Sequence, residues 1–386
     1  MIAVHSRAPL WSIGFRPFYL VASSFAAISI CLWAAQASGH LPFAYLKGSA
    51  WHGHEMLFGY TMAVMAGFLL TAVRNWTGRP TASGGWLCGL AILWIAGRVL
   101  VLTPFALTAA VINAAFPAAL AVAIGIPLVQ ARNARNYFFI GLLLGMSALV
   151  MTLHLGLQGM IDLPAHADLQ LGLDVVLFIM AVMAGRVTPM FTNNGVPGAA
   201  AARHPWIERL ALGSVIALFA GDLLQLADSA IAVVAFVAAA AHGARLRLWQ
   251  SIRTLRTPLV WILHAAYAWI VVHLALRGCA ALGWIAASFA THALTTGAIG
   301  GLTLGMMVRT ARGHTGRKLL ADRWEVAMFA LVQLAACVRT FGGMVNSAWY
   351  VPAMELGGVL WCAAFALYAI RYWPVLTQAR ADGRPG

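Results

Sequence analysis

Apolar segments close to the length that crosses a lipid bilayer follow one another along the whole chain. A membrane-spanning helix needs about 20 apolar residues. We predict such helices at 18–37, 56–73, 86–107, 109–129, 137–157, 169–190, 207–227, 229–244, 258–276, 284–308, 324–341 and 351–372. Only 9% of the residues are charged, against about 25% in soluble domains. We therefore expect one integral membrane domain over 1–386, an all-α bundle of about twelve transmembrane helices.

The net charge of +14 follows the predicted loops. If the N-terminus is cytoplasmic, the inside loops hold most of the Arg and Lys residues, whereas the outside loops hold Lys47 and Arg277. This is the positive-inside pattern of membrane proteins. It predicts that both termini face the cytoplasm and that membrane lipid, not nucleic acid, is the partner of this charge.

One short motif recurs along the chain. Met62–Gly67 reads MAVMAG, the same as 180–185, and a weaker relative stands at 295–300. The three copies lie on predicted helices that all enter from outside. Three parallel four-helix repeats, at 1–130, 131–250 and 251–386, would explain the recurrence. Coincidence in a chain rich in Ala, Met and Gly is the alternative.

Most of the histidines and charged residues within the predicted helices lie in the outer half, and His264, near the cytoplasmic side, is the exception. Ionisable groups are costly inside a membrane, so such a layer is by default a functional-site hypothesis. Imidazole and carboxylate groups are suitable ligands for transition metals. The candidate metal ligands are His54, His292, His264, His273, Glu55 and Asp174. The candidate cofactor-binding residues are His54, His292, His52, His154, Arg98 and Arg339.

Helix geometry separates some of these histidines. His52 and His54 are two positions apart, which turns their side chains about 200° away from each other on a helix. One ion cannot bind both, and we expect His54 to be the ligand. His264 and His273 also face opposite ways, since they are nine positions apart. For His154 and His273, a structural hydrogen bond remains as good an interpretation as ligation.

Two other features have competing interpretations. His292 is followed by Thr295, Thr296 and Gly297, small side chains that let a bulky group or another helix come close. Arg98 and Arg339 either pair with acidic residues at similar depth (Asp174, Asp222 and Glu355) or bind the propionates of a haem. The five cysteines include no Cys-x-x-Cys-His motif, so a haem would be bound non-covalently.

Several longer motifs resemble the NnrS family over essentially the whole chain. They are Gly14–Phe18, Trp51–Gly59, Ala66–Val73 with Asn75–Arg79, Gly185–Thr192, and His292–Thr295 leading to Gly313–Arg317. The resemblance implies a twelve-span protein of the bacterial inner membrane that contains b-type haem and copper and acts in the response to nitric oxide. Arg74 stands where the family pattern leads us to expect proline, a change at a helix end.

Three functions remain open at this stage. The first is a haem- and copper-containing protein that binds nitric oxide or turns it over as an oxidoreductase, protecting the cell from nitrosative stress. A five-coordinate haem iron in an apolar pocket suits a small uncharged gas. The second is a metal or haem transporter, and the third is a sensor or assembly factor without turnover. No segment identifies an electron donor.

Overall fold

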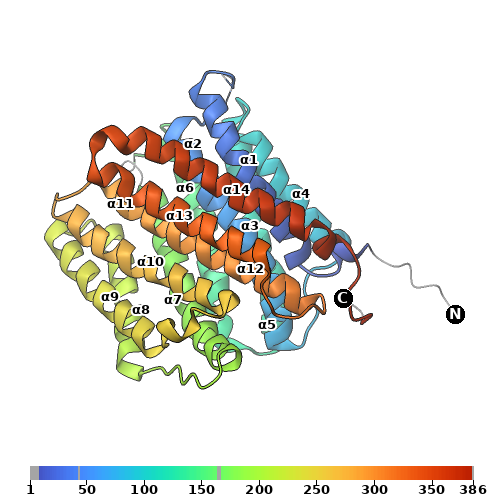
Figure 1. The fold of residues 1–386 in the computed structure, drawn as a ribbon. Coiled ribbons are helices and arrows are strands. Elements are labelled where there is room, and N and C mark those ends of the chain that lie inside the picture. Colours follow the sequence, from blue (N-terminus) through green and yellow to red (C-terminus); the bar gives the residue numbers. More distant parts are fainter. Residues whose placement is uncertain (1–7, 42–43, 163–166, 385–386) are drawn as a thin grey trace. The chain divides into compact units, whose positions relative to one another are not determined.

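The computed structural model describes residues 8–41, 44–162 and 167–384 (Figure 1). Within these residues all regular structure is helical, and each of the twelve segments predicted from the sequence is largely helical. The prediction of 86–107 was too long, because that helix ends at Leu100 and the next begins at Ala106. The helices are α1 (Phe15–Ala37), α2 (Gly48–His54), α3 (Met62–Thr77), α4 (Gly85–Leu100), α5 (Ala106–Gln130), α6 (Phe138–Leu157), α7 (Ala167–Gly195), α8 (Pro205–Leu223), α9 (Asp228–Leu248), α10 (Pro258–Ala281), α11 (Ala287–His292), α12 (Gly300–His314), α13 (Arg323–Val345) and α14 (Tyr350–Thr377).

Two of the predicted spans contain a π-helical segment. The π-helix η2 (Glu55–Thr61) joins α2 to α3, and the π-helix η5 (Ala293–Ile299) joins α11 to α12. Short 3₁₀ turns occur at Pro9–Trp11, Ala134–Asn136, Ser251–Thr254 and Ser347–Trp349. π-helical turns are rare and are frequently found at functional sites.

Local sequence signals account for several helix ends. Proline occupies the first turn of α8 and of α10, where its missing N–H costs nothing. Asp322 and Glu325 form a capping box at the start of α13. Gly78 ends α3 with a φ of +66°, a left-handed conformation that favours glycine.

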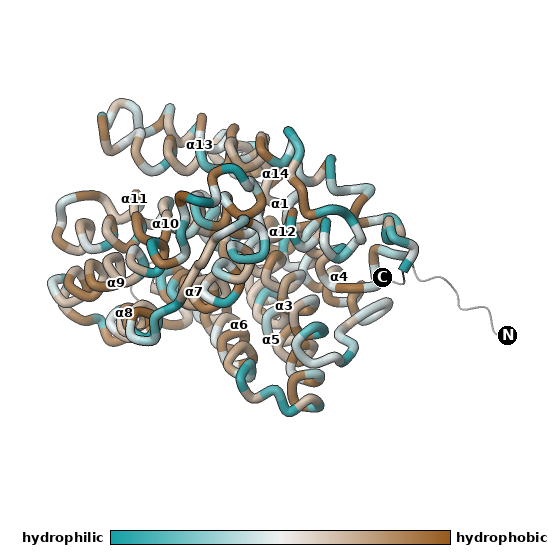
Figure 2. Tube along the Cα trace, turned by 60° about the horizontal axis from the view of Figure 1, so that its bottom comes forward, coloured by the Kyte–Doolittle hydropathy of each residue, from teal (hydrophilic) through white to brown (hydrophobic). Residues whose placement is uncertain are grey.

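Nine helices within the described residues are long and apolar enough to cross a membrane, counting Gly48–Thr77 as one. The predicted spans outside this set are α4, α8 and the α11–α12 segment. α4 has 16 residues, about 24 Å of helix, whereas the hydrocarbon core is about 30 Å thick. Figure 2 shows hydrophobic residues running along the helices, with hydrophilic ones mostly at helix ends and in loops.

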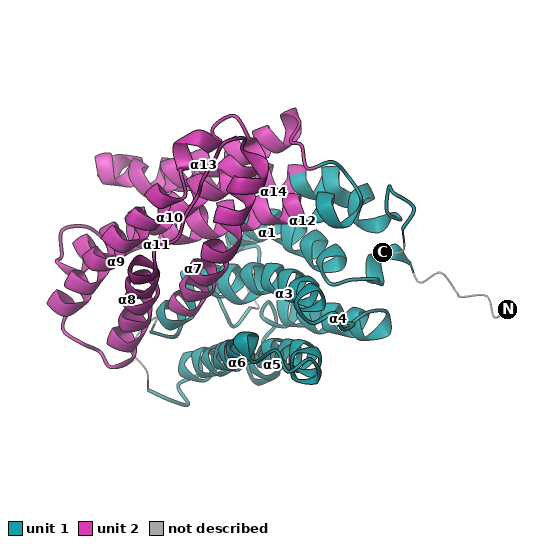
Figure 3. Cartoon of the chain, turned by 90° about the horizontal axis from the view of Figure 1, so that it is seen from below, with its two compact units in different colours: residues 1–172, 310–318, 368–386 teal, residues 173–309, 319–367 magenta. Residues whose placement is uncertain are grey.

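The chain divides into two compact units (Figure 3). Unit 1 comprises residues 1–172, 310–318 and 368–386, and unit 2 comprises 173–309 and 319–367. In unit 1, α1 packs on α2, η2 and α3, while α4 packs on η2 and α5, and α5 on α6. In unit 2, α10 packs on α9, α11 and η5, and α13 packs on α11 and η5. Each π-helix therefore lies between a helix that precedes it and one that follows it in sequence.

Candidate functional site

A chain of buried polar side chains crosses unit 1. His54, at the end of α2, places its Nε2 3.1 Å from the Nε2 of His154 on α6. The Nδ1 of His54 lies 2.7 Å from Oε1 of Glu55, and Nη1 of Arg98 on α4 donates to the same oxygen at 2.5 Å. His54, Glu55 and His154 are all fully buried. Three helices and a π-helix thus bring two imidazoles and an ion pair together in an apolar interior.

Both ends of this chain are anchored. The hydroxyl of Tyr45 contacts Nδ1 of His154, and Nη2 of Arg98 donates to the Asn113 side chain on α5. Burial raises the pKa of Tyr45, which lies in the loop before α2, so its hydroxyl keeps its proton. A phenol can donate or accept, so Tyr45 is compatible with either neutral form of His154. These contacts at the two ends of the chain of side chains therefore do not decide whether Nδ1 or Nε2 of His154 carries the proton.

The hydrogen bonds determine the form of His54. An ionised carboxylate only accepts, so Nδ1–H of His54 donates to Glu55 and its Nε2 carries the lone pair. A carboxylate behind a histidine is the arrangement that orients metal-binding imidazoles and increases their basicity. In the metal-free arrangement, Nε2–H of His154 donates to Nε2 of His54.

The facing nitrogens are suitably spaced for one bare metal ion. Two imidazoles bound at about 2.0 Å to a tetrahedral ion have nitrogens about 3.3 Å apart, close to the observed 3.1 Å. Axial ligands on opposite faces of a haem would need nitrogens about 4 Å apart, at about 2.0 Å from iron on each side. The His54–His154 pair thus fits a copper ion better than it fits a haem.

His52 takes no part in this cluster. Its ring stacks on Trp33 of α1, with centroids 4.2 Å apart and planes 18° from parallel. His54 instead faces His154 and Phe58. The opposite orientation of the two histidines agrees with the prediction from helix geometry.

The ion pair is enclosed by close contacts with backbone. Trp94 on α4 donates from Nε1 to the carbonyl of Gly59 in η2. A Cβ on Gly59 would stand 2.5 Å from Nη1 of Arg98. Glycine at this position therefore lets the guanidinium reach Glu55. The second oxygen of Glu55, Oε2, has no hydrogen-bond partner among the described residues.

In unit 2 a ring nitrogen of each candidate histidine contacts a backbone carbonyl or a hydroxyl. Nδ1 of His273 on α10 lies 2.8 Å from the Ala290 carbonyl of α11, and Nδ1 of His292 lies 2.6 Å from the Ser288 carbonyl. A carbonyl only accepts, so both Nδ1 atoms carry a proton and both Nε2 atoms carry a lone pair. Within the described parts of the chain, Nε2 of His273 has no hydrogen-bond partner, although this side chain is only 2% exposed. His264 instead contacts the Thr192 hydroxyl through Nε2, at 2.8 Å.

The acidic candidate Asp174 belongs to a buried ion cluster. Nη1 of Arg277 donates to it at 2.6 Å, and Nη2 of Arg277 donates to Asp222. Arg277 was expected in an outside loop, but it lies within α10, which extends five residues beyond the predicted end at 276. Its carboxylate partners are those considered for Arg98 and Arg339. Arg98 pairs instead with Glu55, and Arg339 lies 5.4 Å from the ring centroid of Tyr350.

Two residues at or just beyond the predicted end of the helix at 229–244 are buried. Arg245 on α9 forms two hydrogen bonds of 2.9 Å with Glu208, and it also donates to the Ala181 carbonyl and the Tyr267 hydroxyl. His242, one turn earlier, contacts the same hydroxyl at 2.6 Å. Gly185 leaves the space that the Arg245 guanidinium fills. Arg245 is therefore a structural cation and not a loop charge. The sequence signal that could have indicated this role is the spacing of His242 and Arg245, which are three positions apart and so lie on one face of a helix.

The six candidate metal ligands do not converge on one point. Within the described parts of the chain, no three His, Cys, Asp or Glu side chains form a group that could hold a metal ion. His54, Glu55 and the cofactor candidate His154 meet in unit 1. Asp174, His264, His273 and His292 belong to unit 2 and have separate partners.

Protein side chains occupy the space beside the glycines that follow His292. A Cβ on Gly297 would overlap Trp269, and one on Gly300 would stand 2.5 Å from Trp361. Of the two interpretations offered for these small residues, the structure supports close helix packing. A bulky ligand has no space at these positions.

The two α–π–α segments share one sequence register. Residues 51–79 and 289–317 align without a gap at an offset of 238, which pairs η2 with η5. Identical residues at this offset are His54/His292, Gly59/Gly297, Gly67/Gly305, Arg74/Arg312, Thr77/Thr315, Gly78/Gly316 and Arg79/Arg317. Met62 consequently pairs with Gly300, so the match of 62–67 with 295–300 was out of register by five residues. Each π-helix begins directly after the paired histidine.

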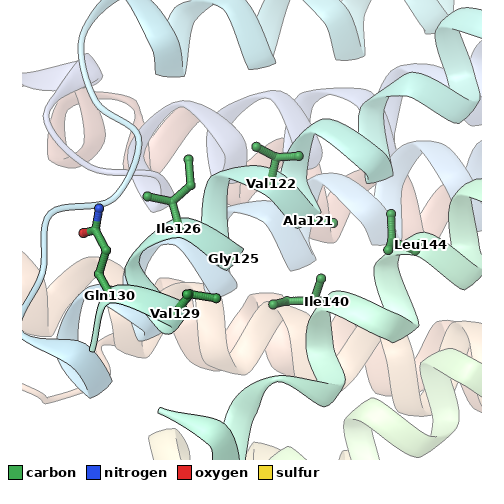
Figure 4. A pocket seen from close by; sticks show the side chains of 8 residues that line it. All are labelled: Ala121, Val122, Gly125, Ile126, Val129, Gln130, Ile140 and Leu144. Carbon is green, nitrogen blue, oxygen red and sulfur yellow. The ribbon is translucent and has the colours of Figure 1, made fainter. Parts of the chain in front are cut away.

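A shallow groove on α5 and α6 is a different kind of feature (Figure 4). Its volume is about 460 Å³, and Gln130 is the one polar residue of its lining. The rest of the lining consists of Ala121, Val122, Gly125, Ile126, Val129, Ile140 and Leu144. The groove offers no ligand for a metal, and the buried histidines remain the candidate site.

Comparison with known proteins assigns the chain to a family. A family model described as NnrS protein matches residues 9–380, nearly the whole length. None of the curated proteins matches the chain. The matched range includes both π-helical segments and every residue of the buried cluster. The chain belongs to the NnrS family.

Proposed function

We propose that this protein is a haem- and copper-containing protein of the bacterial inner membrane that protects the cell from nitric oxide and nitrosative stress. Membership of the NnrS family supports a role in the nitric oxide response. The buried His54–His154 pair, with its 3.1 Å separation of Nε2 atoms, carries the proposal at the level of chemistry.

In this proposal His54 and His154 hold the copper ion through Nε2. Glu55 fixes His54, and the Tyr45 hydroxyl accepts from Nδ1–H of His154 once its Nε2 binds metal. Bound copper would supply one-electron redox chemistry at a site that excludes water. The residues themselves orient the ligands and, through Arg98, compensate the charge of Glu55.

A buried site inside apolar helices suits a gaseous ligand. Nitric oxide is small and uncharged, and it reaches such a site through lipid without a polar path. A transporter of metal or haem needs a route on which its cargo is released. The tightly anchored unit 1 cluster, whose members are buried and hydrogen-bonded on both sides, favours a resident metal. A sensor without turnover would use the same site and differs only in its kinetics.

The test combines purification with a gas assay. Protein from copper- and haem-replete cells should carry both metals, and the reduced protein should bind or consume nitric oxide under anaerobic conditions with an artificial electron donor. His154→Ala should lose copper and this reactivity, because one of the two facing imidazoles is removed. His40→Ala is the matched control, since His40 is exposed and its ring nitrogen Nδ1 contacts the Ser38 hydroxyl, away from the buried histidines.

Three outcomes separate the alternatives. Consumption of nitric oxide by the wild type, lost in His154→Ala, supports an oxidoreductase. Binding without consumption supports the sensor or assembly factor. A metal-free protein that mediates uptake of copper or haem into proteoliposomes would contradict the proposal in favour of a transporter.

A further inference from the structure

We infer that the groove on α5 and α6 binds one anionic phospholipid, with an acyl chain in the groove and the phosphate at Arg132 and Arg135. The whole of this site lies in unit 1. The inference goes beyond the proposed role in the nitric oxide response and takes from it only the location in a membrane.

The groove presents apolar side chains at the surface. Val122, Val129 and Leu144 are 58%, 57% and 50% exposed, and Gln130 is the one polar residue of the lining. Figure 4 shows that the lining side chains come from both helices. Gly125 contributes no side chain at all, which makes the surface hollow between its larger neighbours. Such a surface is favourable only against hydrocarbon.

The length of the groove matches one leaflet of a bilayer. On α5 the lining runs from Ala121 to Gln130, nine positions and therefore about 14 Å of helix. One half of the hydrocarbon core is about 15 Å thick. An acyl chain that enters at the Gln130 end of the groove can therefore lie along it to the middle of the membrane.

Two arginines stand at the Gln130 end. Gln130 is the last residue of α5, and Ile140, which also lines the groove, is in the first turn of α6. Both walls of the groove therefore end at the connection 131–137. This connection contains Arg132 and Arg135, and both side chains are exposed.

Aromatic contacts place this connection at the level of the lipid headgroups. Trp76, near the end of α3, stacks on Phe139 with ring centroids 5.7 Å apart and planes 21° from parallel. Its carbonyl accepts a hydrogen bond of 3.2 Å from the Asn133 side chain within the connection. Tryptophan is enriched at the interface between membrane and water. The arginines beside Asn133 are therefore expected at the depth of the phosphates.

The charge of this region is uncompensated by the protein. The sequence has no Asp or Glu from 56 to 161. None of the ion pairs within the described parts of the chain includes Arg132 or Arg135. A positive-inside loop accounts for the presence of arginine, but not for its position at the mouth of a groove. The planar guanidinium matches the geometry of a phosphate, so the counter-ion that fits is a lipid headgroup with net negative charge.

The backbone at Arg132 provides an unusually clean variant. Its φ is +50°, in the left-handed region that favours glycine. Its N–H donates to the Val129 carbonyl at 2.9 Å and closes the end of α5, where glycine is the commonest residue. Arg132→Gly therefore removes the guanidinium without straining the fold.

The experiment measures lipid binding to the full chain by native mass spectrometry. The protein in detergent is titrated with phosphatidylglycerol, which is anionic, or with phosphatidylcholine of the same acyl chains, which has no net charge. The proteins are the wild type, Arg132→Gly, Arg135→Gln, the double variant R132G/R135Q and Gly125→Leu. In Gly125→Leu the new Cβ stands 3.4 Å from Ile140, an ordinary contact, and the rest of the side chain fills the groove.

Gly141→Leu is the matched control for the filled groove. Gly141 is an exposed residue of α6 outside the lining, and a Cβ there has nothing within 4 Å. Thermal unfolding of every variant in the same detergent shows that each one is folded.

The expected result is one tightly bound phosphatidylglycerol per chain. Each arginine should strengthen its binding about fivefold, so the wild type should prefer it over phosphatidylcholine by about thirtyfold. Arg132→Gly and Arg135→Gln should each lose about fivefold, and the double variant should lose the preference. Gly125→Leu should weaken both lipids, and Gly141→Leu should bind as the wild type does.

Other results overturn the inference. Equal affinity of the wild type for the two lipids, or unchanged binding in R132G/R135Q, would show that the arginines do not hold the phosphate. Unchanged binding in Gly125→Leu would remove the acyl chain from the groove. A dimer that Gly125→Leu dissociates would assign the groove to a second copy of the chain. These results leave the proposed function intact, whereas a protein that is released from cells without detergent would contradict the proposed location and the inference with it.

Discussion

Each candidate histidine differs from the others mainly in what its Nδ1 contacts. For His54 the partner is a carboxylate, for His154 a phenol, and for His273 a backbone carbonyl. The separation of His52 from His54 could be predicted, because it follows from helix geometry alone. The partners could not, since Arg98 is 43 residues from Glu55 and His154 is 100 residues from His54.

Replacing Glu55 by Gln should destabilise the protein, because Arg98 would be left as a buried cation without its counter-ion. The expected loss is about 3 kcal/mol, measured as free energy of unfolding in detergent. Arg98→Gln should have a similar effect for the converse reason.

The double variant E55Q/R98Q gives the control for this prediction. It should be clearly less destabilised than the sum of the single variants, because neither partner then remains unpaired. Additive effects would show that the two side chains do not interact.

Among the elements, the π-helices could not be predicted from sequence. They lie inside apolar segments like those of the other predicted spans, and each packs against neighbouring helices that are distant in sequence. Their common register became visible only once both had been located. The glycines inside them mark the sites of close packing, against Arg98 at Gly59 and against Trp269 at Gly297.

Deleting Met56 should convert η2 toward a regular α-helix. The deletion turns His54 by about 100° relative to α3 and moves it away from His154, so bound copper should be lost. Deletion of Thr295 in η5 is the matched control, for which copper should be retained. Equal copper in both deletion proteins would refute this role for η2.

Gly297→Ala should destabilise unit 2 by about 1–3 kcal/mol, because the new Cβ would overlap the buried Trp269. Gly213→Ala on α8 provides the comparison, since a Cβ there has nothing within 4 Å. Thermal unfolding of the two variants in the same detergent measures the difference. Similar midpoints would contradict the packing at Gly297.

For the whole molecule, hydropathy predicted the twelve helices because each one reports its own apolar length. It did not predict the two units, whose composition depends on contacts between distant segments, such as residues 368–386 with 1–172. The offset of 238 pairs the second predicted span with the tenth. It is compatible with four-helix repeats, whose boundaries remain a prediction.

The positive-inside pattern predicts a cytoplasmic C-terminus and an external connection between α6 and α7. Green fluorescent protein fused after Gly386 should therefore fluoresce. Alkaline phosphatase fused after Gly159 should be active, and the same enzyme fused after Gly386 should be inactive. The reverse pattern of the two alkaline phosphatase activities would invert the topology and place the His54 end of η2 near the cytoplasm.

The most direct test of the central claim is the copper content of His154→Ala beside that of the wild type. His154 is a suitable position because its ring contacts His54 and Tyr45 within unit 1. We predict stoichiometric copper in the wild type and none above background in the variant, with both proteins monodisperse. Equal copper in the two proteins would show that the facing imidazoles form a hydrogen bond and not a metal site.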